Sequence, residues 1–522
     1  MTDASIALNR FGLGARPGED VGSDPRKWLA GQIAAFDPRP QVIAQQAPSS
    51  QVASSLADFY ERQRMLRQAE GPRAQRQPAG PARPAGAQPA MAEGAPTMRE
   101  GMQPGAAMPD GMSAQPAGAL TQNKPGKRLY EGEDAAMLAR REARREQQQY
   151  YVGMVSARAL TAITSPTPFA ERLVHFWANH FAVSADKLEL VGLSGTLEFE
   201  AIRPHVMGKF GDMLNAVERH PAMLLYLDQA VSVGPNSPAM QRQRARRGGL
   251  NENLAREIME LHTLGVRSVY TQADVTEFAR AMTGFTVGGI GRARGAGNLG
   301  GEPGSFVFAE RLHEPGTRTI LGKQWAQDGE GQAAAVLNHL ATHPATARHI
   351  ATKLARHFAN DDPPAPLVAR LEKAFLSSGG DLPTVYRALI ASPECWAPTP
   401  AKFKSPWEWS ISAMRVLGTQ QVQANAVNGL MGQLGQPTWK PGSPAGWDDV
   451  AGAWAGPDAV MRRVEAAERM AQRTKNLIDA RQRAAQLFPD ALSAGTAQSI
   501  ARAESPGQGL ALMLVSPEFM RR

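Results

Sequence analysis

Two glutamates, Glu257 and Glu260, lie three residues apart in a segment that has the pattern of one capped helix, residues 251–265. On a helix this spacing places both carboxylates on the same side, where they could act as the acid and the base of a bond-cleaving reaction. Asn251 is a favourable N-cap residue, and Gly265 is placed to end the helix. The helix is therefore the first candidate for a catalytic element.

The same side of this helix carries Glu252 and Arg256, which allows a second interpretation. Glu252, Arg256 and Glu260 follow one another at i,i+4, and each such ion pair on an exposed helix contributes only about 0.2–0.5 kcal/mol. The polar stripe would then be a solvated surface without chemistry. We expect instead that the stripe is turned inward and meets a cationic stripe from another helix.

His349, Lys353 and Arg356 form that cationic stripe, on one side of a helix expected to begin at Pro344 and to include His357. A lysine between two histidines disfavours a metal ion and suits a carboxylate, sulfate or phosphate group. We therefore predict that this stripe binds an anionic substrate. The stripe could equally pair with the acidic helix, which would fix how the two helices dock without any catalysis.

His175 is a further catalytic candidate, in a helix expected to run from Pro168 to about Phe181. It shares a polar arc of that helix, whereas His180 lies about 140° away among aromatic residues and is expected to be a core histidine. Two histidines on different faces cannot chelate one metal ion from this helix. Cys395 is the only cysteine, which excludes an intramolecular disulfide and a thiolate cluster, so we predict no metal site.

A proline-rich loop at 434–449 contains Trp439 and Trp447 beside two aspartates. Aromatic faces next to carboxylates suit sugar rings, although the tryptophans could equally fix the loop onto the helices. His313 precedes a Glu-Pro-Gly turn and is also included as a candidate. The predicted catalytic residues are thus Glu257, Glu260 and His175, and the predicted substrate-binding residues are His313, His349, Lys353, Arg356, Trp439 and Trp447.

The elements that must position these residues are mainly helices. Hydrophobic residues make up 43% of the 522 residues, and Ala and Leu predominate over Ile and the aromatic residues, which favours helix over sheet. We expect a mainly α, multi-helix globular fold with one small β-hairpin, in which residues 306–308 pair with residues 319–321.

Residues 70–127 differ in composition from the rest of the chain, because Pro, Gly, Ala, Gln and Met dominate them. Such a segment cannot bury enough apolar surface to offset the entropy of ordering, so we predict a long disordered insertion. The predicted organisation is the N-terminal part of the helical domain at 1–69, the insertion at 70–127 and the main helical domain at 128–522.

The net charge of +8 does not by itself indicate a nucleic-acid partner, because the basic residues are not interleaved with aromatic ones. No specific nucleic-acid partner is expected. No apolar run approaches ~18 residues, so no transmembrane segment is expected. The N-terminus lacks a basic end followed by an apolar core, so no signal peptide is visible, which favours the cytoplasm.

Several short motifs, spread along the chain, are shared with a known family. They are Asn9–Gly14, Phe176–Phe181, the helix at 251–265, Tyr270–Asp274 with Ala279–Gly284, His313–Glu314 followed by Leu321–Gly322, His343–Ile350 with Lys353–Leu354, and Gly446–Trp447. In this combination the chain resembles the domain-of-unknown-function 1800 family of bacterial proteins, over nearly its whole length apart from roughly 70–127. The chain has Glu314 where the family commonly carries an aspartate.

The resemblance implies a helical domain that is frequently exported, so it leaves the location of the protein open. It also implies an alkaline-phosphatase-like protein as a candidate partner, because the family is often encoded beside that class. The family has no established activity, and the resemblance therefore supplies no catalytic residues and no cofactor.

Two functions remain open from the sequence. The first is an enzyme-like pocket that cleaves a carbohydrate or another anionic polymer, as a hydrolase or a lyase. The second is a non-catalytic binding or assembly protein, in which the polar stripes are structural and the insertion contacts a partner. A catalytic site would gather several of the candidate residues around one cavity, whereas a structural network would pair each of them without a cavity. The substrate, any cofactor, the oligomeric state and whether the protein is an enzyme stay open.

Overall fold

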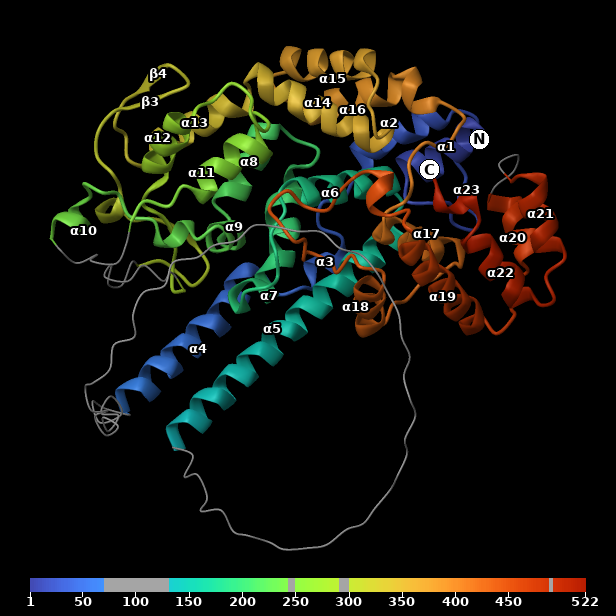
Figure 1. Cartoon of the computed structure of the whole chain (residues 1–522), viewed down its shortest axis with the longest axis horizontal. Coiled ribbons are helices and arrows are strands. Elements are labelled where there is room, and N and C mark those ends of the chain that lie inside the picture. The colour runs from blue at the N-terminus through green and yellow to red at the C-terminus, as the bar shows by residue number, and fades with distance from the viewer. Residues whose placement is uncertain (70–130, 243–248, 291–299, 488–491) are drawn as a thin grey trace, which may run out of the picture. The chain divides into compact units, whose positions relative to one another are not determined.

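The computed structural model describes residues 1–69, 131–242, 249–290, 300–487 and 492–522 (Figure 1). These residues are mainly α-helical, which confirms the predicted fold class. They belong to two compact units, of which the larger holds residues 1–60 and 141–522 and the smaller holds residues 61–140. The predicted insertion at 70–127 lies outside the described residues, and the predicted domain boundaries stay predictions.

The first part of the chain forms short helices and two long ones. The α-helices up to residue 282 are α1 (Asp3–Ile6), α2 (Pro25–Ala35), α3 (Gln41–Ala44), α4 (Ser49–Ala69), α5 (Glu131–Thr164), α6 (Pro168–His180), α7 (Leu188–Thr196), α8 (Phe210–Glu218), α9 (Pro221–Tyr226), α10 (Pro238–Gln241), α11 (Asn253–Glu257) and α12 (Gln272–Met282). Proline occupies the first turn of several of them, where its missing N–H costs no hydrogen bond.

After residue 330 the regular elements of the described chain are helices joined by loops. Its α-helices are α13 (Glu330–Ala341), α14 (Pro344–Phe358), α15 (Ala365–Ser377), α16 (Leu382–Ala391), α17 (Pro406–Val416), α18 (Ala424–Gln433), α19 (Pro457–Arg473), α20 (Ala480–Leu487), α21 (Ala494–Ala501), α22 (Pro506–Leu514) and α23 (Pro517–Met520). Short 3-10 turns occur at η4 (Arg203–His205), η5 (Gln229–Val231), η7 (Glu310–Leu312), η8 (Pro393–Trp396) and η9 (Ala451–Ala453).

Helix α6 lies near the centre of the larger unit (Figure 1). Most of its residues are buried, including the charged Glu171 and Arg172, and it contacts α2 and the π turns near residues 7–11 and 197–202. Helix α17 is buried along its whole length. A capping box between Ser405 and Glu408 fixes where α17 begins. These two buried helices give the candidate site a rigid base.

The described strands form two small antiparallel sheets, and their pairing differs from the predicted hairpin. Strand β2 (Phe306–Phe308) pairs with β1 (Phe285–Val287), and β3 (Arg318–Ile320) pairs with β4 (Lys323–Trp325). The prediction found two strand segments but assigned them to each other, which is wrong. The reason is local: a two-residue turn joins β3 directly to β4, because Leu321 and Gly322 both adopt positive φ.

The helix predicted at 251–265 is present, but it changes type along its length. Its α-helical part is α11, and the chain continues as a π turn, η6 (Ile258–His262). Asn251 accepts a hydrogen bond from the backbone N–H of Asn253 at 2.9 Å, just before the helix. The helical part ends at His262, three residues before Gly265, whose φ is +94°. Two further π turns, η1 (Ala7–Phe11) and η3 (Leu197–Ile202), occur among the described residues.

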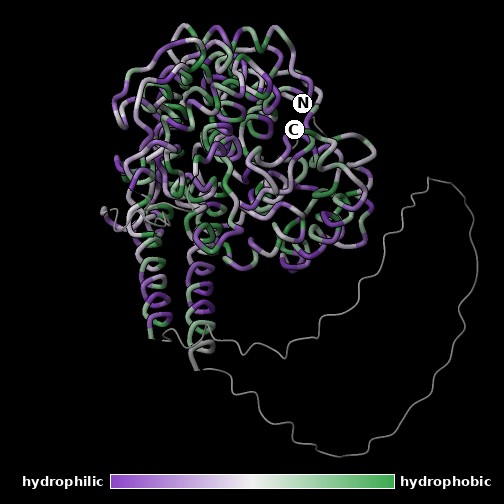
Figure 2. The backbone as a smooth tube through the Cα atoms, turned by 60° about the vertical axis from the view of Figure 1, so that its left-hand side comes forward, coloured by the Kyte–Doolittle hydropathy of each residue, from purple (hydrophilic) through white to green (hydrophobic). Residues whose placement is uncertain are grey.

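Hydrophilic and hydrophobic residues alternate along most of the helices in Figure 2, which is typical of helices that bury one face. The buried faces form one extensive apolar core in the larger unit, with Phe169, Trp177, Leu354 and Trp409 among its fully buried side chains. Within the ranges that the structure describes, every helix is too short or too polar to cross a membrane.

Candidate functional site

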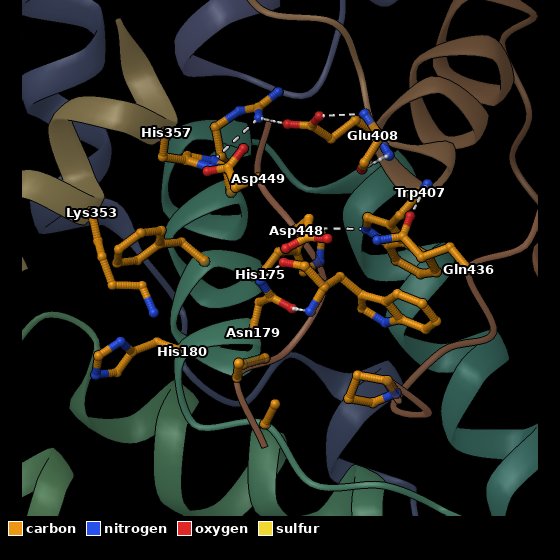
Figure 3. Close-up of a pocket in the computed structure, with 18 of the residues that line it drawn as sticks. His175, Asn179, His180, Lys353, His357, Trp407, Glu408, Gln436, Asp448 and Asp449 are labelled. Carbon is orange, nitrogen blue, oxygen red and sulfur yellow. Dashed lines mark hydrogen bonds and ion pairs between the residues drawn. The ribbon is translucent and has the colours of Figure 1, made fainter. Parts of the chain in front are cut away.

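One cavity of about 360 Å³ brings together side chains from α5, α6, α14, the start of α17 and the loop between α18 and α19. Figure 3 shows Lys353 and His180 on one side of this cavity, with Trp407 and Gln436 on the other. The chain segments that supply the lining are far apart in sequence, so only the folded chain assembles it.

Most of the residues predicted as site residues line this cavity. They are His175, His349, Lys353, Arg356, Trp439 and Trp447. Glu257, Glu260 and His313 are not part of the lining. The fold therefore gathers the cationic stripe, the central histidine and the two tryptophans, and it leaves the acidic helix face outside.

The acidic stripe does not meet the cationic stripe, which contradicts our expectation. Arg256 pairs instead with its own neighbours, at 3.1 Å from Glu252 and 3.5 Å from Glu260, and all three side chains are partly exposed. The oxygens of Glu252 also accept hydrogen bonds from α12. The i,i+4 spacing that the three residues share satisfies their charges locally, so nothing drives the stripe inward.

His349 contacts the same helix segment in a different way, through its backbone. Its Nε2 lies 3.0 Å from the carbonyl oxygen of Leu261, and His180 Nε2 lies 3.1 Å from that of His262. A carbonyl can only accept, so both imidazoles carry their proton on Nε2. Burial lowers the pKa of His349 to about 4 and that of His180 well below its usual value, so both rings are neutral near pH 7.

His313 is buried elsewhere, next to α12. Its Nδ1 lies 2.8 Å from the carbonyl oxygen of Thr283, and the following residue, Glu314, accepts a 2.6 Å hydrogen bond from the backbone N–H of Asn236. Both contacts hold the loop at residues 313–314 against the neighbouring chain segments at Thr283 and Asn236. A substrate-binding role for His313 stays a prediction, outside the cavity described above.

His175 is held by a chain of contacts that begins in the core. Glu198 accepts hydrogen bonds from Arg158 at 2.8 and 2.9 Å, and the Arg158 guanidinium lies 4.2 Å above the ring of Trp407. Trp407 in turn donates its indole N–H to His175 Nδ1 at 3.2 Å. An indole can only donate, so the His175 proton lies on Nε2, which has no partner in the described structure.

The protonation state of His175 follows from its surroundings. Burial is the main cause that lowers its pKa well below the usual value, and the positive charges of Arg158, Arg203 and Arg172 lower it further. His175 is therefore a neutral imidazole with a free Nε2–H donor at the wall of the cavity. A ligand oxygen is the natural acceptor for such a group.

Trp439 is held by the same series of contacts, at the end opposite to His175. Its indole N–H donates to Glu198 at 2.8 Å, and its backbone adopts an unusual φ of +48°. Gly195 allows the close approach, because a Cβ there would lie 2.8 Å from the indole ring. The strained conformation and the glycine show that the position of this ring is strongly specified.

His357 and Asp449 form a hydrogen-bonded pair in the same cavity. Nδ1 of His357 lies 2.7 Å from Asp449 Oδ2, and Arg172 approaches Nε2 at 3.5 Å. Burial disfavours the Asp449 charge, but His357, Lys402 and Arg522 together hold the pKa of Asp449 below its usual range. The ionised carboxylate fixes the His357 proton on Nδ1 and leaves a lone pair on Nε2.

The loop that supplies Asp449 is attached to α6 by one side chain. The amide of Asn179 accepts from the backbone N–H of Trp447 at 2.7 Å and donates to its carbonyl oxygen at 2.8 Å. Gly446 makes this possible, since its φ is +81° and a Cβ on it would collide with the carbonyl oxygen of Asn179. Asn179 and Gly446 therefore position the loop over the cavity.

Lys353 is the exception in a site where most charges are paired. Neither a hydrogen bond nor an ion pair joins its ammonium group to any residue that the structure describes. Burial lowers its pKa to about 8, with Asp449 acting in the opposite direction and Arg356 adding to the effect. Near pH 7 the group is mostly protonated, so Lys353 presents the cavity with a cation that has neither a hydrogen bond nor an ion pair among the described residues.

The sequence interpretation missed the charged floor of the cavity, which is centred on Glu408. This carboxylate pairs with Arg172 and lies 2.8 Å from Nε of Arg522. Burial opposes its ionisation, yet the two arginines hold its pKa well below the usual range. The only sequence signal for Glu408 is its place in a Ser-Pro-Trp-Glu helix start, which predicts a cap rather than a site.

Among the described residues, His, Cys, Asp and Glu side chains do not gather in the groups of three or more that could hold a metal ion. The cavity instead offers an unpaired cation, a neutral imidazole donor, an imidazole whose Nε2 lone pair faces only Arg172 at 3.5 Å, and tryptophan rings. This combination can bind an anionic ring-bearing molecule and move one proton on it.

A protein-family model described as a protein of unknown function (DUF1800) matches residues 6–521. Neither the curated proteins nor the solved structures contain a match to the chain.

Proposed function

We propose, for a chain that belongs to the DUF1800 family of proteins of unknown function, that the cavity binds and cleaves an acidic carbohydrate. The observation that carries the proposal is the unpaired ammonium of Lys353 in a cavity walled by tryptophan rings. A partly buried cation without a partner favours an anionic ligand, and aromatic faces favour a ring. A sugar that carries a carboxylate supplies both.

The proposed chemistry is the removal of a proton by His357. Asp449 holds the His357 proton on Nδ1, so Nε2 can accept a proton from a water molecule or from a ring carbon. In the first case the activated water attacks the anomeric carbon, the glycosidic C–O bond breaks, and the reaction is hydrolysis. In the second case the ring carbon next to the carboxylate that Lys353 neutralises loses its proton, a C=C bond forms, and the C–O bond to the neighbouring sugar breaks. In both cases the proton that His357 accepts passes to the leaving oxygen. The Nε2–H of His175 supplies a hydrogen bond to a ligand oxygen in either reaction.

This assignment changes the catalytic residues that the sequence suggested. Glu257 and Glu260 are not in the lining, so the proposal gives them no part in the reaction. His175 keeps a role, but as a neutral donor. The base is assigned to the His357–Asp449 pair, which the sequence analysis did not select.

Binding is tested with a panel of acidic oligosaccharides, including oligogalacturonates and hyaluronan fragments, against a neutral malto-oligosaccharide by calorimetry. We expect at least one acidic oligosaccharide to bind and the neutral one not to bind. Lys353→Met should weaken binding about tenfold or more, which corresponds to about 1.4 kcal/mol. Lys373→Met, on the exposed face of α15, is the matched control and should bind as the parent does. Equal affinity of both variants, or no binding across the panel, would contradict the proposal.

Cleavage is tested separately on the saccharide that binds. Elimination gives an unsaturated product that absorbs in the ultraviolet, whereas hydrolysis gives only new reducing ends. His357→Asn should abolish product formation while binding persists. Binding without any product in the parent would point to the second function, a binding protein. The ion pairs of Glu408 with Arg172 and Arg522, and of Arg522 with Asp449, would then serve as a fixed framework.

A further inference from the structure

A separate cavity lies among the C-terminal helices, lined by the end of α17, by α18 and by α19. Its volume of about 670 Å³ falls within the range of about 300–1,000 Å³ that is typical of small-molecule sites. None of the residues that line it also lines the cavity of the candidate site. The function proposed above therefore makes no use of this space.

The base of this cavity is apolar. Met414, Val427 and Ala466 line it and are at most 8% exposed. Aromatic side chains are absent from the described lining, whereas tryptophan rings wall the candidate site. Aliphatic and thioether groups adapt to a flexible chain and offer no stacking face for a ring. The partly buried apolar lining residues are Leu417, Val422, Ala426, Leu430 and Met470.

Gly429 leaves space on the α18 side of the cavity. Its backbone has no positive φ, so the helix does not need a glycine there, and glycine within a helix is unfavourable. A Cβ at residue 429 would meet no atom within 4 Å. A larger side chain is therefore allowed at this position and would occupy open space. Gly432 has the same surroundings on the same helix but does not line this cavity.

The rim of the cavity is polar and positively charged. Two exposed arginines of α19, Arg469 and Arg473, are the charged residues of the described lining, to which no aspartate or glutamate belongs. Arg469 is held against α18, because Gln433 accepts a 2.5 Å hydrogen bond from its Nη2. Arg473 makes neither a hydrogen bond nor an ion pair with any described residue. The uncharged exposed side chains of the rim are Gln421, Gln423 and Asn425.

We propose that this cavity binds one long-chain fatty acid, with the acyl chain on the apolar base and the carboxylate at Arg469 and Arg473. The buried apolar base favours a ligand with an apolar body, and the cationic rim favours an anionic end. A guanidinium binds a carboxylate through two parallel N–H···O bonds, and no described residue uses the donors of Arg473. An aromatic acid would lack a stacking partner, and an uncharged lipid would leave both arginines without an anion.

Binding is tested with cis-parinaric acid, a fatty acid that fluoresces when it enters an apolar site, and with myristate as the competitor. We expect saturable one-to-one binding to the full chain and displacement by myristate. Gly429→Leu fills the cavity from α18 and should weaken binding about tenfold or more. Gly432→Leu is the matched control and should bind as the parent does. Equal affinity of the two variants, or no saturable binding by the parent, would overturn the proposal.

The role of the arginines is tested with myristate and tetradecanol, which share the chain length and differ in charge. The double variant Arg469→Gln, Arg473→Gln should lose about tenfold in affinity for myristate and keep the parent's affinity for tetradecanol. Salt should weaken the binding of myristate to the parent, because it screens exposed charges. Arg502→Gln removes an exposed arginine outside the lining and is the control. An unchanged affinity of the double variant for myristate would overturn the proposal.

The position of the ligand is tested by photolabelling with a myristate that carries a diazirine in its chain. Mass spectrometry should find the label in peptides of α18 and α19, and labels confined to other segments would overturn the proposal. A second copy of the chain is the other occupant to examine. A dimer that Gly429→Leu abolishes in sedimentation experiments would assign the cavity to that copy and also overturn the proposal. None of these measurements uses a saccharide, so their outcome is independent of the function proposed for the candidate site.

Discussion

At the scale of single residues, the sequence allowed us to select side chains that stand out within a helix but not the partners of those side chains. Lys353 and His175 interrupt otherwise regular helical patterns and both line the cavity. Glu408 and Arg522, by contrast, have ordinary sequence neighbours. Their importance comes from meeting each other across more than a hundred residues of chain, and no spacing rule along the sequence can reveal such a contact.

The contrast between Glu408 and Glu260 gives a residue-scale prediction. Glu408→Gln leaves Arg172 and Arg522 buried without their carboxylate, so we expect the free energy of unfolding to fall by about 3–5 kcal/mol. Glu260→Gln removes one half of a partly exposed pair and should cost under about 1 kcal/mol. Denaturant unfolding of the two variants measures the difference. Similar losses for both would show that Glu408 does not carry the buried charge network.

At the scale of elements, helices were predicted well because their signals are local. The helix at 168–181 follows from one face of apolar residues and a proline at its start, and α6 reproduces it closely. The strands were harder, since a three-residue strand has little pattern of its own. Residues 306–308 pair with Phe285–Val287 across a segment rich in glycine, a choice that depends on the tertiary fold.

The loop that carries Asp449 gives an element-scale prediction. Gly446→Ala would push the loop away from Asn179, because the backbone at residue 446 has a positive φ and the added Cβ meets the Asn179 carbonyl. We expect a loss of about 1–3 kcal/mol and faster proteolysis near Trp447. Gly442→Ala, in the same loop with nothing within 4 Å of the added Cβ, is the control and should behave as the parent does. If Gly442→Ala is equally damaging, the attachment at Asn179 is not what holds the loop.

At the scale of the whole molecule, composition defined the fold class, because a chain so rich in helix-forming residues has few alternatives. Composition could not predict which elements meet at the cavity, namely α6, α14, α17 and the loop between α18 and α19. The acidic stripe illustrates the limit. Charge complementarity between two helices made a docking plausible, but Arg256 had closer partners within its own helix.

The segment at 70–127 gives a prediction at this scale, and it rests on composition alone. The residues that the structure describes already form an extensive apolar core in the larger unit. Replacing residues 70–127 with a short Gly-Ser linker should therefore change the free energy of unfolding by no more than about 1 kcal/mol. Denaturant unfolding of the parent and the shortened chain measures the change. A loss several times larger would mean that the segment packs against the folded part of the chain.

Because of the π turn η6, the geometry of the site depends on the number of residues in this part of the chain. A π turn is equivalent to an α-helix with one inserted residue, and here it directs the carbonyl groups of Leu261 and His262 to His349 and His180. Removing one residue within Ile258–His262 would restore ordinary α-helical bonding and rotate the chain that follows by about 100°. A related chain that keeps the side chains of residues 251–265 but has one residue fewer within Ile258–His262 would therefore lose this wall of the cavity. A sequence alignment that allows a gap at this point would group chains whose sites differ.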